Sequence, residues 1–150
     1  MSLDVYLTVP GANIQRQGSG IFIREEGTTK EITREEWDRR NPGSTPVTFH
    51  GKEWSDKVFH GNITHNLARM AEAVGLYKPL WRPEEIGVER AEQLIPLLEE
   101  GLATLKECPD IAKGFNPSNG WGAYETLVAF VERYLAACRE WPQAEVEVSR

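Results

Sequence analysis

Two long apolar stripes at helical spacing in the second half of the chain most constrain its fold. Within residues 88–106 apolar side chains recur every three or four positions, and residues 123–140 repeat the same period. Pro96 lies inside the first stripe and removes one backbone hydrogen bond, but the stripe keeps its phase across it. We therefore predict one kinked helix at 88–106 and a second helix that ends at Trp141-Pro142.

Strict alternation of apolar and polar residues predicts a strand near each end of the sequence. The apolar members are Leu3, Val5, Leu7, Val9, Val146 and Val148. We expect these first and last strands to lie side by side, which would close the chain on itself.

The region between the first strand and residue 60 predicts short elements. Apolar residues on both sides of Glu26-Gly27-Thr28 favour a hairpin between about residues 21 and 32. Thr33 can cap a short helix near 34–40 at the Glu36 amide, with Glu36 reaching back, and Asn41-Pro42-Gly43 would end that helix. Residues 47–49 and 57–60 are interpreted as further short strands.

From Asn62 onward the apolar period is helical and predicts a helix over 62–74, with Gly75 as its C-terminal cap. The connections 76–86 and 108–122 are rich in proline, glycine or aromatic residues and are interpreted as ordered loops.

These elements predict an α+β protein. Its small sheet contains the N- and C-terminal strands and packs against three main helices at 62–74, 88–106 and 123–140, plus the short helix near 34–40. Residues 1–150 are expected to form a single domain, in which 11–55 is a variable insert or flap. A chain of 150 residues buries roughly 70% of its unfolded surface, so a core forms without metal or disulfide.

Charge, cysteine positions and hydropathy disfavour several classes of function and location. The net charge of −6 disfavours direct nucleic-acid binding, which needs clustered basic residues. Cys108 and Cys138 have no partners at metal-ligand spacing, so we expect no metal and no cofactor. No apolar run reaches the length of a membrane span and residues 1–10 do not resemble a signal peptide, so a cytoplasmic location is expected.

The segment from His60 to Asn66 is the first candidate site. If a helix begins at Asn62, then Asn62, Asn66 and Arg69 share one flank of its buried stripe and line a cleft. The structural alternative is that Asn62 or Thr64 only caps the helix. His65 is interpreted as pointing away from the stripe, and a metal site formed by His60 and His65 is disfavoured because the spacing matches no zinc motif.

Two aromatic segments are the other candidates. Trp121 lies between glycines just after Asn119 and could stack on a planar ligand, or plug the loop against the sheet. Trp81 is expected to anchor its own loop, and Arg82 to pair with Glu84 or with a partner's carboxylate. No serine, cysteine or threonine lies in a nucleophile motif, so no catalytic residue is assigned.

Several motifs together resemble a family of small hypothetical proteins of bacteriophages, prophages and bacterial genomes. They are residues 62–67 (NITHNL), 80–85 (LWRPEE), 119–125 (NGWGAYE) and 148–150 (VSR). The resemblance covers residues 57–150 and the first ten residues, whereas 11–55 has no match. It implies a phage or prophage protein in the bacterial host cytoplasm, without implying a reaction.

Three functional hypotheses follow. The first is a non-catalytic module that binds a small polar ligand, such as a nucleotide-type host signal, or a host protein; its ligand-binding residues are Asn62, Thr64, His65, Asn66, Arg69, Trp81, Arg82, Asn119 and Trp121. The second is an inhibitor of a host defence system that acts through its acidic surface. The third is a hydrolase or nuclease that uses His60 or His65.

Overall fold

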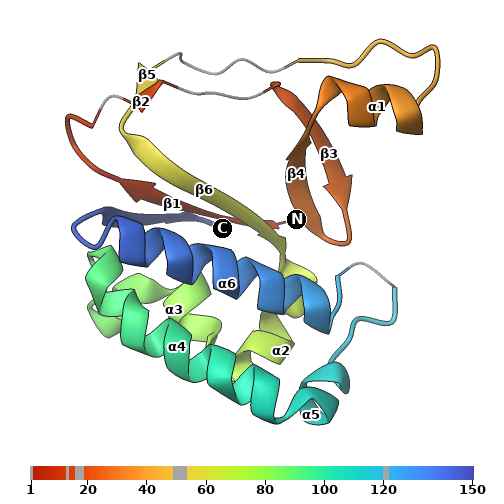
Figure 1. The fold of residues 1–150 in the computed structure, drawn as a ribbon. Coiled ribbons are helices and arrows are strands. Elements are labelled where there is room, and N and C mark those ends of the chain that lie inside the picture. Colours follow the sequence, from red (N-terminus) through yellow and green to blue (C-terminus); the bar gives the residue numbers. More distant parts are fainter. Residues whose placement is uncertain (1, 13, 16–18, 49–53, 120–121) are drawn as a thin grey trace.

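A three-stranded antiparallel sheet forms one layer of the protein (Figure 1). The computed structural model describes residues 2–12, 14–15, 19–48, 54–119 and 122–150. Strand β1 (Ser2–Thr8) lies in the middle, between β6 (Lys57–Thr64) and β7 (Glu145–Ser149). The predicted pairing of the first and last strands is therefore confirmed, with Val5 opposite Val148.

The two faces of the sheet differ in polarity because side chains alternate along each strand. Leu3, Val5 and Leu7 of β1 are fully buried on the inner face. Asp4 and Tyr6 are partly exposed on the outer face, opposite Asn62 and His60 of β6. The polar face of the sheet thus carries side chains that are available for a site.

Helices cover the inner face and form the second layer (Figure 1). The larger ones are α4 (Ala91–Glu107) and α6 (Tyr124–Glu140), which pack against each other. The shorter ones are α2 (Ala68–Ala73), α3 (Tyr77–Trp81) and α5 (Pro109–Lys113), with 3-10 turns η1 (His65–Leu67) and η2 (Pro83–Ile86). The α+β class and the packing of the sheet against a few helices agree with the prediction.

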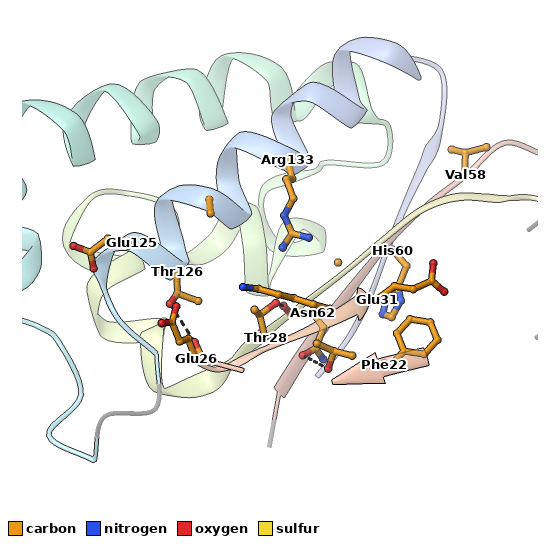
Figure 2. A pocket seen from close by; sticks show the side chains of 14 residues that line it. Phe22, Glu26, Thr28, Glu31, Val58, His60, Asn62, Glu125, Thr126 and Arg133 are labelled. Atoms are coloured by element: carbon orange, nitrogen blue, oxygen red, sulfur yellow. Dashed lines mark hydrogen bonds between the residues drawn. The ribbon is translucent and has the colours of Figure 1, made fainter. Parts of the chain in front are cut away.

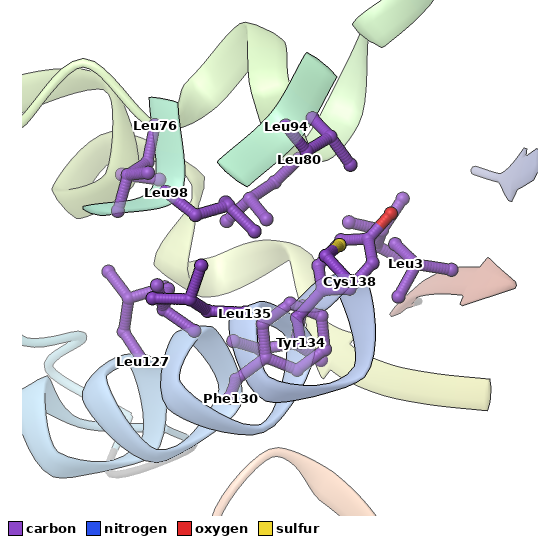
Figure 3. Close-up of a cluster of buried hydrophobic side chains, with 14 of the residues drawn as sticks. Leu3, Leu76, Leu80, Leu94, Leu98, Leu127, Phe130, Tyr134, Leu135 and Cys138 are labelled. Carbon is purple, nitrogen blue, oxygen red and sulfur yellow. The ribbon is translucent and has the colours of Figure 1, made fainter. Parts of the chain in front are cut away.

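The core fills the space between the two layers. Figure 3 shows leucines of α4 and of the α2–α3 region meeting Phe130, Tyr134 and Cys138 of α6. Helix α4 runs through Pro96 as one helix, as the unbroken stripe predicted. Within the described ranges, every helix is too short or too polar to span a bilayer.

The remaining strands lie outside this sheet. Strands β3 (Ile21–Glu25) and β4 (Thr28–Ile32) form the predicted hairpin, and β2 (Ile14–Gln15) pairs with β5 (Trp54–Ser55). The two-residue turn of the hairpin has φ angles of 52° at Glu26 and 81° at Gly27, which match the right-handed twist of the strands. The hairpin stands beside the edge of the sheet, with the next helix alongside it (Figure 1).

That helix, α1 (Arg34–Arg40), begins as predicted, because the Glu36 amide donates to Thr33 Oγ1 at 3.1 Å. Its expected second capping bond is replaced: the Glu36 carboxylate accepts from Arg40 instead, at 2.8 Å. Asn41 ends the helix, in agreement with the prediction.

Four local predictions were wrong. Residues 62–64 continue strand β6, so the helix predicted over 62–74 begins only after Thr64, first as η1 and then as α2. Both segments interpreted as loops contain helices, α3 and η2 in one and α5 in the other. Val47 and Thr48 form no strand, and Phe49 lies outside the described residues.

Candidate functional site

A hollow of about 1180 Å³ lies between the β3–β4 hairpin, strand β6 and helix α6 (Figure 2). This volume lies slightly above the roughly 300–1,000 Å³ of most ligand pockets. We call this hollow the hairpin pocket. Its lining residues are Phe22, Glu26, Thr28, Thr29, Lys30, Glu31, Val58, His60, Gly61, Asn62, Glu125, Thr126, Ala129 and Arg133.

The turn of the hairpin is fixed to the end of β6 and closes the pocket at that end. The Thr64 amide donates to the Gly27 carbonyl at 2.7 Å, and Thr28 Oγ1 donates to the Asn62 carbonyl at 2.7 Å. Thr126 of α6 adds a third bond, from Oγ1 to the Glu26 carbonyl at 3.1 Å. These bonds join three elements that are far apart in the sequence.

Close backbone contact requires glycine at this junction. A Cβ on Gly27 would lie 2.6 Å from Thr64 Cγ2 and 3.2 Å from the Gly122 Cα, and Gly122 itself has φ near +96°. The hairpin turn, the end of β6 and the residue before α6 therefore pack with no space for an additional methyl group.

Asn62 is the centre of the polar network on the pocket floor, and all the hydrogen-bonding groups of its side chain are used. Its Nδ2 donates to Ser2 Oγ at 3.0 Å and to Asp4 Oδ1 at 2.9 Å. Its Oδ1 accepts from Arg24 Nη1 at 3.0 Å and from Thr29 Oγ1 at 3.2 Å. Asn62 is only 7% exposed, so its carboxamide joins the hairpin to β1 and has little capacity left for a ligand.

His60 is oriented by its neighbours on the outer face of the sheet. Its Nε2 lies 2.8 Å from Asp4 Oδ1, and its ring stacks on Tyr6 with 4.8 Å between centroids. Lys57 places its ammonium 4.1 Å from the centroid of the Tyr6 ring. Because Nε2 is bonded to Asp4, the imidazole presents Nδ1 as its remaining polar atom.

Arg133 extends from α6 into the hairpin pocket, and its guanidinium points toward Thr28 and Asn62 (Figure 2). Throughout the described part of the chain, this guanidinium makes no hydrogen bond or ion pair. Lys30 of β4 contributes a second cation to the lining. A ligand with an anionic group would find both charges on the walls of the pocket.

Carboxylates limit how much negative charge the pocket can take. Glu26 and Glu125 lie at the end near the hairpin turn, and Glu31 lies near His60 at the other end (Figure 2). Glu125 is 4.0 Å from Lys113, whereas Glu31 accepts from the Gly20 amide at 3.2 Å. The pocket therefore suits a ligand with one localised anionic group rather than an extended polyanion.

The residues predicted at the helix start do not gather around one cleft. Thr64 is buried and caps η1, where its Oγ1 accepts from the Asn66 amide at 3.3 Å. Asn66 and Arg69 are exposed on η1 and α2 and do not line the hairpin pocket. The shared flank predicted for Asn62, Asn66 and Arg69 was wrong because Asn62 is in a strand.

His65 and Trp81 contact each other away from the hairpin pocket, and Arg82 follows Trp81 in the chain. The Trp81 indole donates to His65 Nδ1 at 2.8 Å, so His65, which was interpreted as pointing away from the apolar stripe, is half-buried and hydrogen-bonded. Partial burial lowers the pKa of His65. Trp81 is 2% exposed and anchors its segment as predicted, whereas Arg82 pairs with Glu85 at 3.4 Å rather than with Glu84.

Asn119 is exposed and does not line the pocket, and Trp121 lies outside the described residues. Gly122, just after the Asn119 segment, lies close to Thr64 at the closed end of the pocket. Of the nine predicted ligand-binding residues, Asn62 lines the hairpin pocket. Within the described ranges, no group of three or more His, Cys, Asp or Glu side chains is arranged to hold a metal ion.

Sequence reasoning missed Arg133, Lys30 and the hairpin as parts of the site. The hairpin itself was predicted, and an arginine at position 133 lies outside the apolar stripe of its helix. A charge in that position is normally a solvated surface group, so only the placement of the hairpin opposite α6 distinguishes it.

A scan of protein-family models and searches of curated proteins and of solved structures found no match for this chain.

Proposed function

We propose that this protein is a non-catalytic binding protein, and that its hairpin pocket holds a polar ligand through one anionic group. The resemblance to phage and prophage proteins supports an accessory role in an infected or lysogenic bacterium. In that role the anionic group would belong to a nucleotide-type host signal or to a host protein, and the chemistry at Arg133 would be the same for both.

The observation that carries this proposal is the guanidinium of Arg133 inside a large hollow, where it has no hydrogen-bond or ion-pair partner among the described residues (Figure 2). Arginine presents several N–H donors in a fixed plane and binds carboxylate or phosphate through two hydrogen bonds at once. The surrounding wall contains Lys30 and the aromatic ring of Phe22. Such a combination of cation and aromatic surface suits a ligand with a charged group and an apolar or planar part.

Native mass spectrometry of freshly purified protein, followed by thermal-shift measurements with a panel of nucleotides, tests the small-molecule form of the proposal. Arg133→Gln is expected to abolish or strongly weaken binding. Arg69→Gln is the matched control, because Arg69 is also exposed and lies on α2 away from the pocket. Loss of binding in the Arg69 variant alone would locate the site at the start of α2 and refute the pocket.

A catalytic function is the second candidate, and the 2.8 Å contact between His60 and Asp4 favours it. A carboxylate that orients an imidazole is a common arrangement for general-base catalysis, in which the other ring nitrogen takes a proton from water. His60→Gln would then abolish hydrolysis of a bound ligand while leaving its affinity nearly unchanged. If the ligand is recovered intact after incubation with the native protein, the catalytic candidate fails.

The hypothesis that the protein inhibits a host defence system through its acidic surface stays a prediction.

A further inference from the structure

Two strand edges, rather than two strand faces, border the hairpin pocket. On β4 the lining residues are consecutive, from Thr28 to Glu31. On β6 they are Val58, His60 and Asn62, which share one face, together with Gly61, which has no side chain and can line the hollow only through its backbone. Successive side chains point to opposite faces of a strand, so a cavity on a face would contact every second residue. The consecutive run on β4 and the contact with the Gly61 backbone on β6 therefore indicate that backbone edges face the hollow.

Strand β6 is the outer strand of its sheet and pairs only with β1 among the described strands. Near the C-terminal end of β6, the hairpin covers the edge of the strand that faces away from β1. There the Asn62 carbonyl is bonded to Thr28 and the Thr64 amide to Gly27. His60 lies two residues earlier, so its N–H and C=O point to the same side as those of Asn62. In the part of the chain that the structure describes, no backbone hydrogen bond reaches these two groups of His60.

An uncovered strand edge beside a helix is a binding groove for extended chains. Main-chain hydrogen bonds to the edge give affinity, and pockets for alternate side chains give specificity. Here α6 and the β3–β4 hairpin form the two walls, and Arg133 projects from the helix wall (Figure 2). Because the hairpin is bonded to the β6 backbone at Asn62 and Thr64, the open edge is the part of β6 before Asn62, and this length suits a few residues and not a long strand.

We propose that the occupant of the hairpin pocket is a short extended segment of a partner protein, which adds as a strand to the open edge of β6. An acidic side chain of that segment would bind Arg133. Glu26, Glu31 and Glu125 also line the pocket, so the segment carries one acidic residue and not a run of them. This inference rests on the proposed function and names the class of its ligand.

Selection from a displayed library of random hexapeptides tests the proposal. We expect the selected peptides to contain one conserved acidic position and to bind with a Kd below about 100 µM. N-methylation of the backbone amides that face β6 should weaken binding about fivefold or more, because each removes one hydrogen-bond donor. In an NMR titration the amide signal of His60 should shift, and Arg133→Gln should weaken the same peptides.

Two variants of His60 separate its backbone from its side chain. His60→Pro removes the outward N–H and should abolish peptide binding, whereas His60→Ala keeps that N–H and should bind the peptides measurably more tightly than the proline variant. If the proline variant does not fold, the N-methylated peptides supply the same comparison on the ligand side. The proposal is overturned if no peptide is selected, if N-methylation leaves affinity unchanged, or if the His60 amide does not respond.

Failure of this inference is distinguishable from failure of the proposed function. If a nucleotide binds the native protein and binds Arg133→Gln more weakly, the proposed binding function of the pocket is supported and the proposal that its ligand is a peptide is overturned. Absence of both peptide and nucleotide binding would overturn both.

Discussion

The indole N–H of Trp81 donates a hydrogen bond to Nδ1 of His65, with 2.8 Å between the two nitrogens. Indole nitrogen is only a donor, so His65 must be neutral, with its proton on Nε2. Protonation of Nδ1 would break this bond and charge a half-buried ring. Burial accordingly lowers the pKa of His65 from its ordinary value.

This relationship predicts a loss of stability in mild acid. The folded state binds a proton at His65 less readily than the unfolded chain, whose pKa is near 6.5. The His65 contribution is therefore fully present above pH 6.5 and is lost as the pH falls from there through the lower pKa of the folded state. Urea denaturation across this range should show the decline, and His65→Gln, which keeps an acceptor for Trp81, should flatten it. Equal slopes in the two proteins would contradict the prediction.

Removal of the hydroxyl group from each of two tyrosines should affect the free energy of unfolding differently. Tyr134 has a fully buried hydroxyl without a hydrogen-bond partner among the described residues, whereas the Tyr124 hydroxyl donates to the Leu105 carbonyl at 2.7 Å. Tyr134→Phe should leave stability unchanged or raise it by about 1 kcal/mol, and Tyr124→Phe should lower it by about 1 kcal/mol. Chemical denaturation measures both. A clear loss of stability in Tyr134→Phe would mean that a partner exists.

Gly101→Ala should destabilise the protein, although alanine ordinarily stabilises a helix relative to glycine. Gly101 lies inside α4, and a Cβ there would overlap the side chain of Leu76. Overpacking of this kind costs about 1–3 kcal/mol. Combining Gly101→Ala with Leu76→Ala should cost less than the sum of the two single changes. Strict additivity would show that the two residues are not in contact.

The two cysteines should differ sharply in reactivity. Burial raises the pKa of the Cys138 thiol to about 12, and this side chain is fully enclosed in the core. Cys108 is partly exposed at the end of α4. A thiol reagent at pH 8 should therefore modify one cysteine quickly and the second only in denaturant, because thiolate is the reactive form. Fast labelling of both thiols in the native protein would contradict the burial of Cys138 in the core.

Asn62→Ala should loosen the hairpin from the sheet. The change removes four hydrogen bonds, to Ser2, Asp4, Arg24 and Thr29, and leaves several partners unsatisfied. We expect a loss of about 1–3 kcal/mol and faster hydrogen exchange in β3 and β4. Asn66→Ala is the control, since Asn66 is exposed and surface changes stay within about 0.5 kcal/mol. If the two variants lose equal stability, Asn62 is not the residue that holds the hairpin to the sheet.

The elements that the sequence predicted best are those with an unambiguous period. Residues 3–9 alternate without interruption, and the stripe in α4 keeps its phase across Pro96, so both elements could be located from the sequence. Thr33 supplied a local signal for the start of α1. In each case the pattern and the local chemistry favour the same structure.

The boundary near Asn62 failed because Ile63 fits two patterns. It begins a helical stripe with Leu67 and Met70, and it also lies opposite Leu3 on the inner face of the sheet. Residues 62–64 form a strand because they pair with β1, and this pairing joins positions far apart in the sequence, such as Leu3 and Ile63. Tertiary context overrode the local period.

The candidate site was less predictable than the fold because it has no local motif. Its walls come from the hairpin, β6 and α6, and their key cation, Arg133, has the sequence context of an ordinary surface charge. Asn62, one of the predicted ligand-binding residues, lines the hairpin pocket, but its carboxamide is bonded internally. The packing of Gly27 against Thr64 and Gly122, with the hydrogen bonds around it, brings these elements together, and it depends on contacts between residues far apart in the sequence.

The central position of β1 has a consequence for folding during synthesis. This strand is translated first among the three, yet both of its neighbours, β6 and β7, follow much later. Its two edges stay uncovered until β6 and then β7 have been synthesised. Such long-range pairing slows folding and exposes apolar surface to aggregation or to chaperones.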